Sequence, residues 1–88
     1  MAKISIYGIE IDETCASYLN IVVKLASSGD SDDRETRRRA LRNLGRNGCR
    51  DALFYLIEKY SSSGDSDERK VRRTAFEYLE RLDSGEDI

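Results

Sequence analysis

An internal repeat constrains the fold of this chain more than any other feature. Residues 27–46 recur at residues 62–81, thirty-five positions further along, and twelve of the twenty aligned positions are identical. Both copies begin with Ser-Ser-Gly-Asp-Ser-Asp and continue into an arginine-rich stretch. A repeat of this length is one supersecondary unit that cannot bury its apolar side alone, so its copies stack. The repeat therefore predicts architecture and says little about chemistry.

Apolar residues follow helical spacing in four segments, residues 12–26, 32–45, 50–60 and 66–82. The absence of proline and a charged fraction of 36% favour uninterrupted helices. We expect four antiparallel helices in two stacked hairpins. Their expected inward side chains are Cys15, Tyr18, Leu19, Val22, Leu25 and Ala26; Thr36, Ala40, Leu41 and Leu44; Leu53, Leu56, Ile57 and Tyr60; and Val71, Ala75, Phe76, Tyr78, Leu79 and Leu82.

Helix starts are marked by short polar residues. Asp12 or Thr14 is the expected N-cap of the first helix. For the second helix we expect Ser31 or Asp32, and Asp32 with Glu35 would form a capping box.

The N-terminus alternates isoleucine with other residues at positions 4, 6, 9 and 11, around Tyr7-Gly8. This pattern predicts a short β-hairpin or a bent strand that covers the first helix. The 88 residues are expected to form one domain. Its parts are a β element (1–11), helical repeat 1 (12–46), helical repeat 2 (49–83) and a frayed tail (84–88).

The charges are strongly segregated, although the net charge is only −2. Seven arginines and one glutamate in residues 34–50 give +6, whereas residues 1–33 and 51–88 each carry −4. On a helical wheel four of these arginines share one outward arc in which Glu35 is the only acid. We call these four the arginine face: Arg38, Arg39, Arg42 and Arg46.

Like charges at helical spacing repel one another by a few tenths of a kcal/mol per pair, so stability alone does not favour the arginine face. One hypothesis is a site for phosphates or for an acidic protein surface. The alternative is a solvated face neutralised by the acidic loops or by another copy. The second repeat places Glu77 and Thr74 on the same arc, which argues against a long nucleic-acid groove.

The sequence of the first repeat has a family resemblance. Residues 33–48 run Asp-Arg-Glu-Thr-Arg-Arg-Arg-Ala-Leu-Arg-Asn-Leu-Gly-Arg-Asn-Gly, Asp51-Ala52-Leu53 follows, and the second copy gives Val71-Arg72-Arg73-Thr74-Ala75 and then Leu79. Over about residues 15–83 this resembles the short HEAT-like repeat of phycobilisome-lyase-type proteins. The chain departs from that pattern in its longer loop without proline and in having two repeats only. The tetratricopeptide repeat has a similar period of about 34, but its Trp, Gly, Tyr and Pro marks are missing.

The resemblance implies a binding role first. HEAT-like proteins are mostly scaffolds that bind protein; a minority bind DNA, a few are base-excision enzymes, and phycobilisome-type members attach or remove pigments. The resemblance also places Arg37 and Arg72 where such repeats carry an arginine that pairs with turn carboxylates, as a structural ladder. Two pairings stay open: Arg72 with Asp30, Asp32 or Asp33, and Arg37 with Asp65 and Asp67.

Catalytic and metal chemistry have little support in the sequence. Histidine is absent, and no nucleophile-base arrangement or phosphate loop is present. The acidic loops fail the calcium-loop template, because Glu35 and Leu41 stand where glycine and glutamate are required. We expect no enzyme activity, no cofactor and no metal.

The two cysteines, Cys15 and Cys49, lie on apolar helix faces, and no signal peptide, membrane span or lipidation motif is visible. We expect reduced core thiols in a cytoplasmic protein. The predicted function is a non-enzymatic protein-binding module or small adaptor that engages an acidic partner. The alternatives are a nucleic-acid-binding protein and a small structural subunit. Two repeats leave apolar ends, so a homo-oligomer is also expected.

Overall fold

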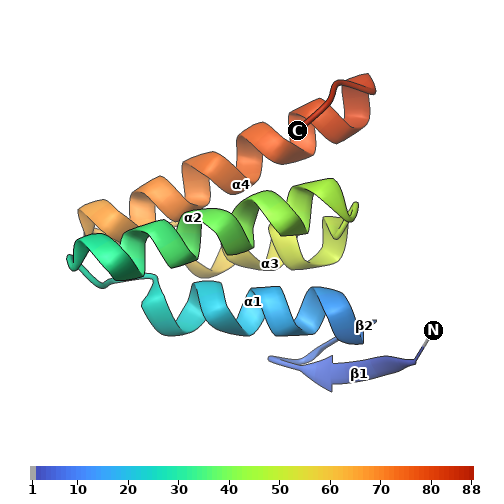
Figure 1. Ribbon diagram of the computed structural model, residues 1–88, viewed down its shortest axis with the longest axis horizontal. Helices are drawn as coiled ribbons and strands as arrows, with labels where there is room; N and C mark the ends of the chain where they lie inside the picture. Colours follow the sequence, from blue (N-terminus) through green and yellow to red (C-terminus); the bar gives the residue numbers. More distant parts are fainter. Residues whose placement is uncertain (1) are drawn as a thin grey trace.

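The computed structural model describes residues 2–88 and has four helices behind an N-terminal β-hairpin (Figure 1). The elements are β1 (Lys3–Ile6), β2 (Ile9–Asp12), α1 (Glu13–Leu25), α2 (Ser31–Arg46), α3 (Arg50–Lys59) and α4 (Ser66–Ser84). The expected mainly helical fold with a short β element is therefore confirmed.

The helices form two hairpins that pack side by side. α1 packs on α2 and α3 on α4, while α2 contacts α4 and α1 contacts α3 across the seam between the hairpins. Figure 1 shows α2 in front of α3, with α1 and the β-hairpin on one side and α4 on the other. Residues 27–46 and 62–81 have the same secondary structure at every position.

The two acidic loops are built in the same way. The carboxylate of Asp30 caps α2 by accepting hydrogen bonds from the backbone N–H groups of Asp32 and Asp33, and Asp65 caps α4 equivalently. The prediction of Ser31 or Asp32 as the N-cap, with an Asp32–Glu35 capping box, is wrong because α2 already begins at Ser31. In α1, Asp12 is the N-cap, one of the two expected residues.

The core lies between the two hairpins, where Leu19, Leu44 and Leu53 are fully buried. Three expected core residues lie outside it: Thr36 is exposed, Phe76 is 53% exposed, and Leu25 is half-buried at the end of α1. The buried side of α2 is turned toward α4, so Arg37 is buried where Thr36 was expected, while Leu41 is buried as expected. Thr36 and Phe76 lie on the sides of α2 and α4 that no other described element covers.

The β-hairpin turns at Tyr7 and Gly8, both with positive φ (52° and 82°), as a two-residue turn of the primed type requires. Ile4 pairs with Ile11 across its two antiparallel strands. The Tyr7 ring stacks on Tyr55 of α3 with the centroids 5.3 Å apart. The hairpin thus covers α1 and reaches α3.

The expectation of reduced thiols is wrong, since Cys15 and Cys49 form a disulfide. Cys15 lies in the first turn of α1, and Cys49 is the N-cap of α3. Stacking the hairpins brings these two helix starts together, with the Cα atoms 5.8 Å apart, inside the range that a disulfide needs. The sequence alone did not show this juxtaposition.

The C-terminal tail, expected to fray, lies against α2. Gly85 ends α4 in the left-handed conformation, and the N–H of Glu86 donates to the carbonyl of Arg81. Ile88 then packs over Gly45, where an added Cβ would come within 2.9 Å of the isoleucine side chain. Glycine at position 45 thus provides the space for this contact.

Candidate functional site

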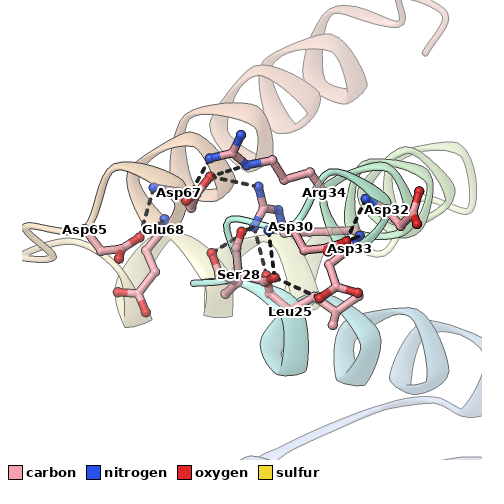
Figure 2. Close-up of polar contacts among 11 residues, drawn as sticks. Leu25, Ser28, Asp30, Asp32, Asp33, Arg34, Asp65, Asp67 and Glu68 are labelled. Carbon is pink, nitrogen blue, oxygen red and sulfur yellow. Dashed lines mark hydrogen bonds and ion pairs between the residues drawn. The ribbon is translucent and has the colours of Figure 1, made fainter.

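An ion cluster joins the two repeats at the acidic loops. The Nε of Arg34 donates to Asp67 Oδ1 at 3.0 Å (Figure 2). Nη2 of Arg37 lies 3.4 Å from the same oxygen. Both arginines come from α2, and the carboxylate comes from the first turn of α4. Of the two pairings left open by the sequence, the structure has the one between Arg37 and Asp67.

Arg37 also completes the end of α1. Its Nη1 donates to the carbonyl oxygens of Leu25, Ala26 and Ser28 at 2.8, 3.0 and 3.3 Å. These carbonyls belong to the end of α1 and the loop that follows it, where helix geometry leaves acceptors without partners. With a side chain only 6% exposed, Arg37 links α1, α2 and α4 from inside the molecule.

Arg72, the counterpart of Arg37 in the second repeat, makes fewer interactions. Its Nη1 donates to the carbonyl of Ser61 at 2.8 Å, and the residue is half-buried. Within residues 2–88 no carboxylate forms an ion pair with it. The ladder expected from the sequence therefore has one complete rung, at the seam, and one incomplete rung, at the end of the stack.

The cluster shifts the titration of its carboxylate. The hydrogen bond from Arg34 holds the pKa of Asp67 below its ordinary value, and the charges of both arginines act in the same direction. Burial of the carboxyl opposes this effect. The cluster therefore favours the ionised form of Asp67.

The arginine face is exposed along α2. One carboxylate, Glu35, accepts from Arg38 at 2.7 Å and from Arg39 at 3.2 Å, and these two side chains remain 71% and 76% exposed. The hydrogen bond from Arg38 is the main reason that the pKa of Glu35 is lowered. Among the described residues no hydrogen bond or ion pair reaches the side chain of Arg42, whereas Arg46 donates to the carbonyl of Ile88 at 3.3 Å.

A hollow of about 300 Å³ lies between this face and α4. Its lining residues are Glu35, Arg38, Arg39, Arg42 and Tyr78. The guanidinium of Arg81 lies 6.0 Å from the centre of the Tyr78 ring, in cation–π range. Tyr78 was expected in the core; it packs against the core and also borders the hollow, and its position at the edge of the apolar side of α4 was the available signal.

The arrangement is suited to binding anions. Guanidinium groups offer forked donors that match carboxylates and phosphates. Within residues 2–88 no three His, Cys, Asp or Glu side chains gather as metal ligands would. None of the described helices combines the length and the apolar character needed to span a membrane.

Comparisons with protein-family models, with curated proteins and with solved structures give no match.

Proposed function

We propose that this chain is a non-enzymatic protein-binding module or small adaptor, built as a two-repeat HEAT-like stack, that engages an acidic partner through its arginine face. The observation that carries the proposal is the hollow beside α2. Three exposed guanidinium groups, those of Arg38, Arg39 and Arg42, surround it with a single carboxylate between them.

The energetics of the free protein support a binding role. Adjacent arginines on one helix face lower helix stability by a few tenths of a kcal/mol per pair, and Glu35 offsets only part of this repulsion. A partner that supplies further carboxylates would complete the pairing. Tyr78 adds an aromatic surface of the kind enriched in binding interfaces.

A protein partner is favoured over nucleic acid because the basic surface is short. On α4 the position equivalent to Arg42 is Glu77, so the positive strip does not continue to the second repeat. The net charge of −2 also opposes long-range attraction to a phosphate backbone. Nucleic-acid binding through α2 is the second candidate, since the arginine spacing would also suit phosphates. A role as a small structural subunit of a larger assembly is the third.

A paired charge reversal tests the proposal. The partner captured from the native host is identified, and its affinity is measured for the wild type and for Arg38→Glu with Arg42→Glu. We expect affinity to fall more than about tenfold, because charge reversal at a contact costs several kcal/mol. The thermal midpoint should stay or rise slightly, because repulsion on α2 is relieved.

The matched control is Lys3→Glu with Lys24→Glu, which makes the same change of charge away from α2 and should leave affinity unchanged. Unfolding of the arginine variant would show that these arginines are structural. Equal affinity of variant and wild type would show that the face is merely solvated. Micromolar binding to mixed-sequence DNA or RNA with a steep salt dependence would favour the nucleic-acid alternative.

The Cys15–Cys49 disulfide is typical of oxidising compartments and does not support the expected cytoplasmic location, which was based on the lack of a visible signal peptide and on reduced thiols. The proposed binding role does not depend on the compartment, because the disulfide lies at the starts of α1 and α3 and outside the hollow.

A further inference from the structure

The outer side of the second hairpin has the features of a contact surface that is left open. In the first repeat, Leu19 of α1 and Leu41 of α2 face the second repeat and are buried. Thirty-five positions later the same places hold Phe54 and Phe76, which are 54% and 53% exposed. Two large aromatic side chains thus occupy, in the last repeat, the places where the first repeat makes its inter-repeat contact.

Basic residues accompany the two phenylalanines. Arg34 and Arg37, which hold Asp67 across the seam, correspond to Arg69 and Arg72. Neither Arg69 nor Arg72 forms an ion pair with any carboxylate of the described residues. We call this surface the end face: Phe54, Arg69, Arg72 and Phe76.

The residues that would complete the end face are present at the other end of the chain. In the seam Arg34 and Arg37 contact Asp67, the last residue of segment 62–67, and residues 27–32 have the identical sequence and end in Asp32. Both loops fold alike, since Ser28 and Ser63 donate to Asp33 and Glu68 at 2.8 and 2.6 Å, and an aspartate caps the helix in each. The segment that carries the contacted aspartate thus occurs a second time, with Asp32 in the place of Asp67.

The side chains of the first acidic loop that correspond to the seam contact are exposed. Asp32 corresponds to Asp67, is exposed, and its carboxylate accepts no hydrogen bond from the described residues. Thr36 corresponds to the buried Val71 and is also exposed. We call this second surface the leading face: Asp32 and Thr36. It belongs to the outer side of α2, away from α4.

We infer that a second copy of this chain docks head to tail, with its leading face on the end face of the first. Asp32 of one copy then meets Arg69 and Arg72 of the other, as Asp67 meets Arg34 and Arg37 within one chain. Thr36 comes to lie near Phe76, and both phenylalanines lose solvent exposure. The charges are complementary, and the acidic loop has the sequence already seen in the internal contact.

Such a contact joins two different surfaces, so each added copy presents a new end face. An interface of this heterologous kind extends into a chain of copies unless rotation closes a ring. The inference therefore goes beyond the proposed binding role, because the occupant is a second copy of this chain. By the same correspondence Lys70 and Thr74, which border the seam, map to Glu35 and Arg39 at the edge of the arginine face, whereas Arg42 maps to Glu77 outside the seam.

Sedimentation equilibrium of the full chain in non-reducing buffer, from about 10 µM to about 1 mM, tests the inference. The average mass of the wild type should rise with concentration from 10.0 kDa to beyond the dimer. Asp32→Arg and Arg69→Asp should each weaken association at least about tenfold, because like charges then face each other. The double variant restores opposite charges and should associate again. Phe76→Ser should weaken association through loss of apolar contact.

Controls separate this contact from other surfaces. Arg42→Asp, on the arginine face, should self-associate like the wild type, while Arg69→Asp should keep its affinity for the captured partner. Far-ultraviolet circular dichroism checks folding, and Asp32→Asn with Arg69→Gln replaces any reversal that unfolds, with a smaller expected loss. A wild type that stays monomeric to about 1 mM, a dimer that does not extend, or association unaffected by either single change would overturn the inference.

Discussion

Replacing Arg37 by alanine tests whether the seam depends on a buried guanidinium. The change removes the donor to three carbonyl oxygens, at 2.8, 3.0 and 3.3 Å, and the 3.4 Å contact to Asp67. Asp67 keeps Arg34 as a partner, but the three carbonyl oxygens lose their donor; breaking a buried pair and leaving buried acceptors unsatisfied costs about 3–5 kcal/mol. A domain of this length has a total stability of about 4–13 kcal/mol. The loss is therefore a large share of the total and should lower the thermal midpoint by at least about 12 °C.

The internal repeat supplies a matched control. Arg72 has the same sequence position in its repeat but makes a single hydrogen bond, to the Ser61 carbonyl, from a half-buried position. Arg72→Ala should cost about 1 kcal/mol and lower the midpoint by about 4–8 °C. Thermal melts and urea titrations at neutral pH measure both variants. Partner affinity of Arg37→Ala should be unchanged, because the guanidinium is buried away from the arginine face.

Equal effects of the two substitutions would refute this reasoning. So would a loss below about 1 kcal/mol for Arg37→Ala, since it would mean that the three carbonyls find other donors at little cost.

Two further predictions concern the disulfide and a buried phenol. The Cys15–Cys49 disulfide closes a loop with a sequence separation of 34, so its reduction should lower the free energy of unfolding by about 4 kcal/mol on the chain-entropy model. Thermal melts with and without reductant measure this loss. In the variant Cys15→Ser with Cys49→Ser, reductant should have no effect on the melt. Burial raises the pKa of Tyr60 from 10.0 to about 12. The folded protein thus favours the neutral phenol of Tyr60. The contribution of this neutral phenol to folding stability is complete below pH 10.0 and is lost as pH rises toward about 12. In a pH titration followed by phenolate absorbance, one tyrosine should ionise at higher pH than the others, and Tyr60→Phe should remove that step. A step that persists in this variant would show that it does not belong to Tyr60.

The helices were predictable because their apolar periodicity and caps are local signals. The orientation of each buried side was not, because it depends on what lies next to a helix. Thr36 and Val71 have equivalent positions, yet only Val71 is covered by a neighbouring repeat. The same reason explains why Phe76 is exposed and Leu41 is buried.

The candidate site was predictable to a similar extent. The exposure of Arg38, Arg39 and Arg42 follows from their positions on one helix. Tyr78 was missed because its place beside the hollow depends on how α4 lies against α2. The disulfide was missed because two cysteines on different helices give no sequence signal of their distance, and the pairing of Arg37 with Asp67 needed the same tertiary information.

The disulfide and the Arg37–Asp67 pair fasten the two hairpins at opposite ends of the same seam. The disulfide joins the starts of α1 and α3, whereas the ion pair lies at the acidic loops, one helix length away. Any rotation of one hairpin against the other would have to break one of these two attachments as well as the buried contacts of Leu19, Leu44 and Leu53 between the hairpins. The disulfide thus closes the side of the seam that the ion pair does not reach.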